Sequence, residues 1–342
     1  MMQIRYINNL FFLLSLLVLL AGCIREDEYD NDPVGNFEQL WKIIDERYCF
    51  LDEKGIDWNA VHDEYRQYIL PGMTDEDLFD KLSEMLFILK DGHVNLSSAS
   101  RTSYYDAWYE GYPWNYREDI LYQYYLGSAS SGYRTSAGLK YKIFDNNIGY
   151  IRYESFNDGV GDGNLDEVLV YLSTCNGLII DVRDNGGGSL TYSERIAARF
   201  TNKRVLTGYI RHKTGTGHSD FSDPEPIYLE PSNSIRWQKP VVVLTNRRCY
   251  SATNDFVNAM RSIESGNIIQ IGDQTGGGSG LPFSSELPNG WGIRFSASPH
   301  YDKEMNSLED GILPDIAIDM SEEDLLKGKD TLIEKAFEVL NN

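Results

Sequence analysis

The chain has 342 residues, with 52 acidic side chains, 31 basic ones and a formal net charge of −21. So large a negative charge repels phosphate backbones, which argues against nucleic acid as a partner. The four cysteines show no CxxC spacing, so neither a disulfide framework nor a zinc site is predicted.

Residues 1–22 have the pattern of a secretion signal. Arg5 precedes an apolar stretch, Leu10 to Ala21, that is too short to span a bilayer as a helix. The signal ends in Leu20-Ala21-Gly22-Cys23, which resembles the lipobox of bacterial lipoproteins, where the cysteine carries the lipid. We therefore expect a mature chain of 320 residues (342 − 22), anchored through acyl chains on Cys23.

Residues 23–35 are rich in acidic side chains and have little to bury, so they are predicted to form a tether. Ile24 follows the cysteine where an aspartate would signal inner-membrane retention, and Glu26-Asp27-Glu28 resembles surface-export tags of some lipoproteins. The expected location is therefore extracytoplasmic, at the outer membrane, on its periplasmic face or at the cell surface.

Residues 36–95 are predicted to form a small helical subdomain that ends at Asp91-Gly92-His93. Residues 96–145 follow as an aromatic-rich segment. Ten aromatic side chains lie between positions 104 and 125, several in near alternation, which predicts strands or a hairpin. Two roles stay open for these side chains, packing between layers or lining a substrate groove.

From residue 146 to 342, apolar strands alternate with helical patterns, which predicts an α/β layer with a mostly parallel sheet. The polar stretch 212–233 is expected to be a long loop, either a lid or a simple excursion. The last element, residues 322–340, is predicted to be one amphipathic helix.

Two strand ends in this region carry the chemistry. Residues 178–182 run into Gly186-Gly187-Gly188, and glycines after a strand can turn their N–H groups into a cradle for negative charge. Residues 241–245 lead to Ser251, where a helix is predicted to begin at Ala252. The pattern indicates acyl transfer, with Ser251 as nucleophile and with Ala252 and Gly186 or Gly187 as oxyanion donors. Five histidines are candidate bases, and sequence position alone does not select one.

Six motifs occur in an order that resembles the serine peptidases of the C-terminal processing type. They are Asp91-Gly92-His93, Ile148-Gly149-Tyr150-Ile151, Asp181-Val182-Arg183 with the three glycines, Ser251-Ala252-Thr253-Asn254, Gly272-Asp273-Gln274-Thr275-Gly276-Gly277, and Glu309-Asp310-Gly311-Ile312-Leu313-Pro314-Asp315-Ile316. Members with a Ser/Lys dyad carry a lysine in the glycine-rich turn after the nucleophile, and residues 275–280 contain none. The chain is therefore more similar to the branch of the tricorn core protease and interphotoreceptor retinoid-binding protein.

That resemblance implies Ser251 as nucleophile, His93 as base and Glu309 as the supporting acid. The tricorn pattern has a serine where this chain has Gly92. Only 55 positions (148 − 93) separate His93 from Ile148, too few for the PDZ domain of many tail-specific relatives.

The resemblance also implies a core like that of crotonase and Clp protease, in keeping with the α/β pattern. The expected function is a lipid-anchored extracytoplasmic serine endopeptidase that acts on peptides or proteins and requires no metal or organic cofactor. The alternative is an inactive binding protein for an apolar or glycan ligand on the same scaffold. The sequence determines neither the cleavage preference nor the oligomeric state.

Overall fold

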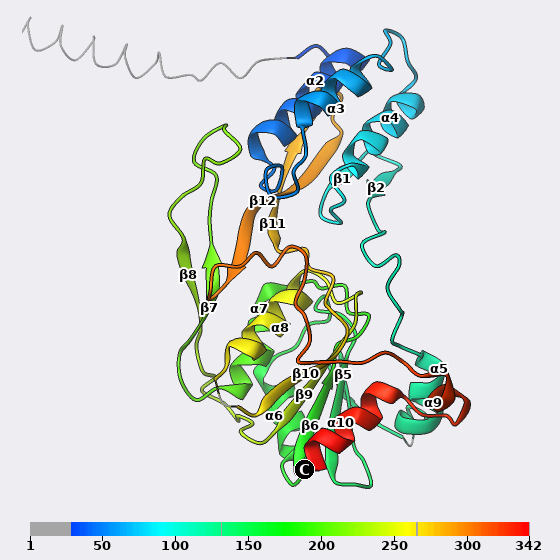
Figure 1. Ribbon diagram of the computed structural model, residues 1–342, viewed down its shortest axis with the longest axis vertical. Coiled ribbons are helices and arrows are strands. Elements are labelled where there is room, and N and C mark those ends of the chain that lie inside the picture. The colour runs from blue at the N-terminus through cyan, green and yellow to red at the C-terminus, as the bar shows by residue number, and fades with distance from the viewer. Residues whose placement is uncertain (1–28, 131, 265, 342) are drawn as a thin grey trace, which may run out of the picture.

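A computed structural model describes residues 29–130, 132–264 and 266–341 of the chain (Figure 1). It confirms the predicted α/β class, with a helical region at the N-terminus and two β-sheets. In the part of the chain that it describes, no helix is long and apolar enough to cross a membrane. The predicted signal and Cys23 lie outside the described residues.

The core is a seven-stranded sheet, parallel from β5 to β13 and antiparallel at the β3–β4–β5 edge. In spatial order its strands are β13 (Ile316–Ala317), β10 (Ile268–Gly272), β9 (Val241–Thr245), β6 (Gly177–Asp181), β5 (Ile148–Tyr153), β4 (Leu139–Ile143) and β3 (Arg134–Ser136).

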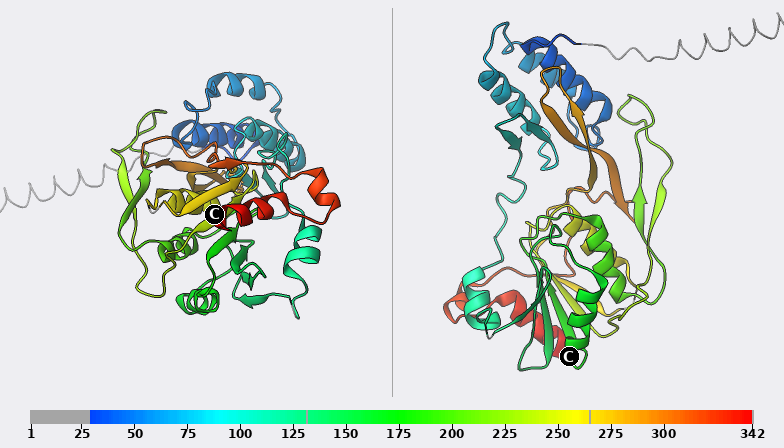
Figure 2. Two further views of the ribbon diagram at one scale, coloured as in Figure 1. Left: turned by 60° about the horizontal axis from the view of Figure 1, so that its bottom comes forward. Right: turned by 180° about the vertical axis from the view of Figure 1, so that it is seen from behind.

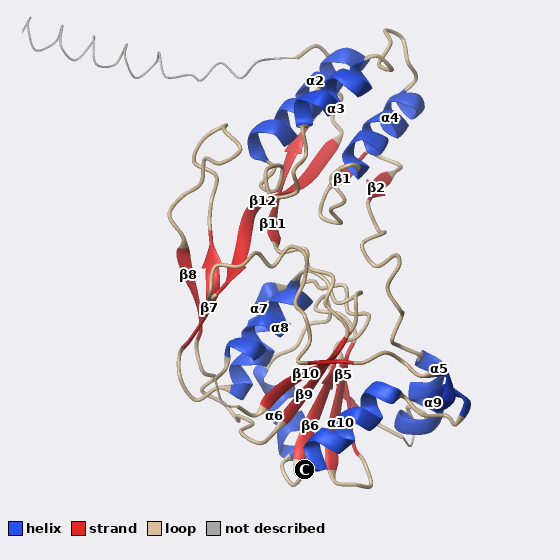
Figure 3. Ribbon diagram, in the orientation of Figure 1, coloured by secondary structure: helices blue, strands red, loops and turns tan. Residues whose placement is uncertain are grey.

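Helices cover both faces of this sheet (Figure 3). On one face lie α6 (Asp162–Leu172), α7 (Leu190–Ala197) with the short 3-10 helix η2 (Ala198–Phe200), and α8 (Ala252–Ser262). On the other lie α5 (Glu118–Ile120), the π-helix η1 (Leu121–Leu126), and α10 (Thr331–Asn341). Side chains alternate along β9, Val241 and Val243 facing the first layer and Val242 and Leu244 the second, because a strand has a period of two.

The second sheet joins the N-terminal helices α2 (Pro33–Arg47), α3 (Trp58–Arg66) and α4 (Asp75–Phe87) to the core. Its strands are β1 (Asn95–Ser97), β2 (Thr102–Tyr104), β7 (Val205–Ile210), β8 (Glu225–Leu229), β11 (Gly280–Glu286) and β12 (Gly292–Asp302). Figures 1 and 2 show the β11–β12 hairpin extending from the core to these helices. Trp291, Ile293 and Phe295 of this hairpin region are buried in the same cluster as Phe37 and Leu82. The N-terminal subdomain therefore shares its hydrophobic core with residues some 200 positions away.

The aromatic segment differs from its prediction. Beyond β2, residues 105–117 form no strand, and residues 118–126 are helical. The buried side chains of this helical stretch have helical spacing: Ile120, Leu121, Tyr125 and Leu126. The prediction followed the more conspicuous alternation of Tyr112 and Trp114, which are exposed.

Three element boundaries also differ from prediction. The first helix begins at Pro33, inside the predicted tether, because the Asp32 side chain caps it by accepting a hydrogen bond from the Gly35 N–H at 2.8 Å. The stretch 212–233 is not only a loop, since it contains β8, which pairs with β7. The closing helix is two helices, α9 (Glu322–Leu326) and α10, separated at Gly328, whose φ of 71° favours glycine.

A buried ion network supports the end of β6. The Arg183 guanidinium donates to both Asp181 and Asp330 at distances of 2.6 to 3.1 Å, and all three side chains are fully buried. Asp330 also accepts from the N–H groups of Leu332 and Ile333 at the start of α10. One arginine therefore ties the strand that leads to the glycine turn to the C-terminal helix.

Replacing this cation should destabilise the whole fold. Arg183→Met removes the positive charge between two buried carboxylates, and leaving buried charges unpaired costs about 3–5 kcal/mol. Urea unfolding should show the loss as a lower midpoint. Arg117→Met, which removes the exposed ion pair with Asp119, should leave the midpoint close to wild type. A midpoint unchanged in Arg183→Met would show that the network contributes little.

Candidate active site

Ser251 occupies a sharp turn between β9 and α8. Its backbone angles are φ 58° and ψ −125°, a conformation that costs non-glycine residues energy and that occurs at nucleophile elbows. The turn is held by hydrogen bonds from the Ser251 N–H to the Gly277 carbonyl at 2.8 Å and from the Tyr250 N–H to the Asn185 carbonyl at 3.1 Å. The turn thus projects the side chain away from the sheet, and Ala252 begins the helix.

The structure brings His93 to this serine. His93 lies between α4 and β1, and its Nε2 is 2.9 Å from Ser251 Oγ, although 158 positions separate the two residues. The ring is almost completely buried. Burial lowers the pKa of His93, and the nearby Asp91 carboxylate only partly opposes this effect. The imidazole is therefore neutral near pH 7 and able to accept the serine proton.

Asp91, which sequence reasoning left without a role, is a buried hydrogen-bond centre. Its carboxylate accepts from the His93 N–H at 2.8 Å, the Ser296 hydroxyl at 2.8 Å, the Tyr48 hydroxyl at 3.0 Å and the Tyr250 hydroxyl at 3.3 Å. These donors come from the N-terminal subdomain, from β12 and from the turn before the nucleophile. Only the Asp-Gly-His motif hinted at this function, because the other donors are distant in sequence.

Glu309 lies close to the nucleophile loop but makes no hydrogen bond to His93. Its carboxylate is 2.8 Å from Lys54 Nζ and accepts from the Ser279 N–H at 3.1 Å. Its backbone carbonyl accepts from the Gly278 N–H at 3.1 Å. The His93 Nδ1 atom is buried and has no hydrogen-bond partner among the described residues. Glu309 therefore supports the glycine-rich turn beneath Ser251, and no carboxylate binds the imidazole directly.

The two buried carboxyl groups have pKa values pushed in opposite directions. For Asp91, burial is outweighed by the Lys54 ammonium, His93 and the hydrogen bonds, so its pKa is lowered. For Glu309, burial and the Asp91 charge raise the pKa to about 8. Asp91 is therefore the more acidic of the two carboxyl groups, and it keeps its negative charge to a lower pH than Glu309 does.

The predicted oxyanion donors lie beside the serine, but not all are free. The Gly187 N–H donates to the Asn185 side chain at 2.9 Å, so it is already engaged. Within the described residues the N–H groups of Gly186 and Ala252 have no hydrogen-bond partner. Gly187 is needed for close approach instead, because a Cβ there would lie 2.8 Å from Ser251 Cβ. Gly186 and Ala252 are thus the available pair.

An aromatic pair covers the histidine. Trp108 stacks on Tyr250 with ring centroids 4.4 Å apart, and the Tyr250 ring lies 5.2 Å from the His93 ring. A Cβ on Gly92 would lie 2.9 Å from the Trp108 side chain, so the aromatic segment leaves no room for a side chain at position 92. Part of that segment therefore packs against the site.

The other candidate residues lie elsewhere. His62 and His218 contact Glu38 and Asp45 of the N-terminal region, and His212 contacts Ser298. Cys249 is fully buried, and burial raises its pKa to about 12, so it is a structural thiol. The described residues include no group of three His, Cys, Asp or Glu side chains that could bind a metal.

Comparison with known proteins identifies the family of the chain. The model for peptidase family S41 matches residues 147–318, and that for the tricorn protease C1 domain matches residues 29–87. The crystal structure of a proposed peptidase from Parabacteroides merdae is 52% identical, with a TM-score of 0.85, and the match covers 91% of this chain and 97% of that one.

Two curated relatives are more distant. Tricorn protease from Thermoplasma acidophilum is 28% identical over 56% of this chain and 16% of its own length. The chloroplastic C-terminal processing peptidase of Tetradesmus obliquus is 25% identical over 50% of this chain and 35% of its own length. The chain therefore spans about a third or less of the length of these relatives.

The family resemblance inferred from the motifs is confirmed, as is the serine-type peptidase class that it implied. The chain belongs to peptidase family S41.

Proposed function

We propose that this protein is a serine endopeptidase with Ser251 as nucleophile and His93 as general base. The observation that carries the proposal is the 2.9 Å contact between His93 Nε2 and Ser251 Oγ. Beside it lie the N–H groups of Gly186 and Ala252, which have no partner in the part of the chain that the structure describes. A nucleophile, a base within hydrogen-bond reach and donors for the developing charge are the three elements of acyl transfer.

In the proposed mechanism Ser251 Oγ attacks the peptide carbonyl while His93 Nε2 takes the hydroxyl proton. The carbonyl oxygen becomes an oxyanion, held by the N–H groups of Gly186 and Ala252, each worth about 3 kcal/mol of transition-state stabilisation. His93 then protonates the leaving amine, the C–N bond breaks and an ester to Ser251 remains. Water attacks this ester, gives its proton to His93 and releases the acid, and the proton returns to Ser251.

Loss of the nucleophile should abolish turnover without unfolding the protein. In Ser251→Ala neither peptide hydrolysis nor labelling by a fluorophosphonate probe should be detectable. Ser262→Ala, in the same helix with its hydroxyl bonded to the Asn258 carbonyl, should keep both. Hydrolysis that persists in Ser251→Ala would disprove the assignment.

The same experiment addresses the alternative of an inactive binding protein. A wild-type protein that resists the probe and cleaves no peptide, but binds an apolar or glycan ligand, would support that alternative. The close His93–Ser251 contact and the strained serine favour catalysis, because a pure binding role needs neither.

The pH profile should report the buried base. Because burial lowers the pKa of His93 below 6.5, the neutral imidazole persists into mildly acidic solution. We expect kcat/KM to stay constant from neutral pH down to the lowered pKa of His93. Below that pKa it should fall about tenfold per pH unit. Circular dichroism over the same range should confirm folding. If kcat/KM instead fell with a midpoint above pH 6.5, burial would not be lowering the pKa of the base.

The two buried carboxyl groups should respond differently to amide substitution. Glu309→Gln keeps the size of the side chain and one oxygen that can accept, and Glu309 makes no hydrogen bond to His93. We therefore expect kcat/KM at pH 7 to fall no more than about tenfold, the equivalent of roughly one hydrogen bond. Asp91→Asn removes a charge and places an amide nitrogen against hydroxyl donors, so misplacement of His93 should cost about 10²-fold. If kcat/KM fell further in Glu309→Gln than in Asp91→Asn, then Glu309, and not Asp91, would be the carboxyl group that acts on His93.

Location is proposed from the N-terminal sequence alone. The lipobox-like Cys23 and the residues after it favour a lipid anchor at the outer membrane, facing the periplasm or the surface. Peptide or protein substrates outside the cytoplasm follow from that location.

A further inference from the structure

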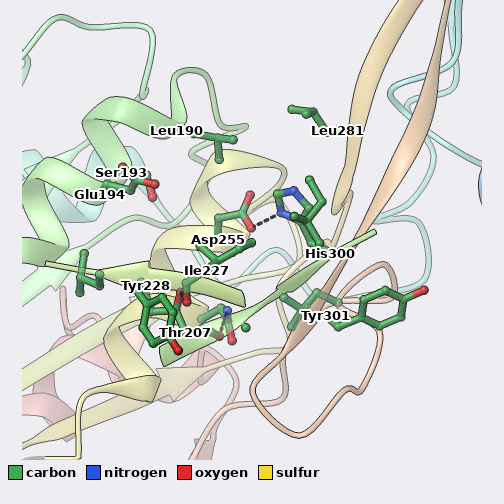
Figure 4. A pocket seen from close by; sticks show the side chains of 16 residues that line it. Leu190, Ser193, Glu194, Thr207, Ile227, Tyr228, Asp255, Leu281, His300 and Tyr301 are labelled. Carbon is green, nitrogen blue, oxygen red and sulfur yellow. Dashed lines mark hydrogen bonds and ion pairs between the residues drawn. The ribbon is translucent and has the colours of Figure 1, made fainter. Parts of the chain in front are cut away.

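A cavity of about 250 Å³ lies between α7, α8 and strands β7, β8 and β12 (Figure 4). Leu190, Ile227, Ala259 and Leu308 are among the apolar residues in its walls. Because an apolar cavity of about 150 Å³ holds benzene, this one is large enough for an aromatic side chain.

The cavity lies one helical turn from the candidate nucleophile. Leu190 begins α7 three residues after Gly187, which abuts Ser251. Asp255, one turn into α8, also lines the cavity, and its N–H donates to the Ser251 carbonyl at 3.1 Å. The cavity wall therefore includes the first turn of α7, which follows Gly186, and the first turn of α8, which begins at Ala252.

The direction of a bound peptide follows from the position of the base. The leaving amine must meet His93 Nε2, which reaches Ser251 from the N-terminal subdomain. The carbonyl oxygen must meet the N–H groups of Gly186 and Ala252, which lie just before α7 and at the start of α8. The residue that supplies the scissile carbonyl is therefore the one nearest to the cavity that these two helices line.

One polar atom in the wall has no partner. His300 is buried and its Nδ1 lies 3.2 Å from Asp255 Oδ1, a contact drawn as a dashed line in Figure 4. Its Nε2 is also buried and has no hydrogen-bond partner among the described residues. Leaving such an atom unpaired costs free energy that a ligand group can recover.

We propose that this cavity binds the side chain of the residue on the carbonyl side of the cleaved bond, and that it selects tyrosine. The ring fills the apolar walls and the hydroxyl pairs with His300 Nε2. Phenylalanine fits the walls but leaves the nitrogen unpaired, and alanine leaves the cavity empty. This specificity rests on the proposed peptidase function.

The test uses the full chain and a set of peptides that differ only in that residue: tyrosine, phenylalanine, alanine and lysine. We expect kcat/KM for tyrosine to exceed that for phenylalanine about tenfold, one hydrogen bond's worth, and to exceed that for alanine at least about 10²-fold. Mass spectrometry should place the cut after the varied residue.

Two variants separate the apolar walls from the polar contact. Ala259→Leu fills the cavity, so tyrosine and phenylalanine peptides should lose about 10²-fold while the alanine peptide changes less than about threefold. His300→Phe keeps an aromatic ring but removes both nitrogens, so the tyrosine-to-phenylalanine ratio should fall to about one. The ratio compares two peptides on the same variant, so a general effect of losing the Asp255 contact cancels.

The outcomes distinguish this inference from the proposed function. An enzyme that reacts with the fluorophosphonate probe but prefers alanine or lysine, or shows no preference, overturns the specificity and leaves the function intact. Preference determined by the residue after the cut does the same. A protein that neither reacts with the probe nor cleaves any peptide overturns both.

Discussion

The site depends on one hydrogen bond, between His93 and Ser251, which joins two parts of the chain that fold around different cores. The bond forms only while the N-terminal subdomain stays docked. Strand β12 holds it there, because it pairs with β1 through Asn95 and Arg294 and with β7 through Ile210 and His300. The proposed catalysis therefore requires the N-terminal subdomain to be docked.

The nucleophile turn stores strain that the surroundings must hold. A non-glycine residue in this conformation costs about 1–3 kcal/mol. Ser251 keeps it because the backbone is bound before and after the turn. The Tyr250 N–H donates to the Asn185 carbonyl, and the Asp255 N–H donates to the Ser251 carbonyl. Asn185 lies two residues after Arg183, so the buried ion network and the loop that faces the serine adjoin at the C-terminal end of β6. Buried charge there thus supports the geometry of the turn that follows the strand.

The features that the sequence predicted follow local rules. Apolar strands that end in glycines or in serine before a helix can be recognised from neighbouring residues, so Ser251 and the glycine turn were identifiable. Lys54 pairs with Glu309, and Asp91 accepts from Tyr250 and Ser296, all more than 150 positions away. No local pattern marks Lys54, and for Asp91 only the Asp-Gly-His motif gave a hint. The shared core of β12 and the N-terminal helices was missed for the same reason. The glycine pattern predicted the turn at Gly187 correctly. It did not predict that the Gly187 N–H donates to the Asn185 side chain and is therefore unavailable to an oxyanion.

Position 92 shows how the site differs from the pattern that it resembles. A Cβ at Gly92 would lie 3.2 Å from the Tyr250 hydroxyl and 2.9 Å from Trp108, so a serine there would compete with both aromatic side chains. The Tyr250 hydroxyl already accepts from the Gly92 N–H at 3.1 Å and donates to Asp91. A hydroxyl is therefore present beside the base, supplied by the residue that precedes the nucleophile. It binds the carboxylate rather than the imidazole, so in this chain the hydroxyl beside His93 helps to hold Asp91, the carboxyl group whose charge opposes the lowering of the His93 pKa.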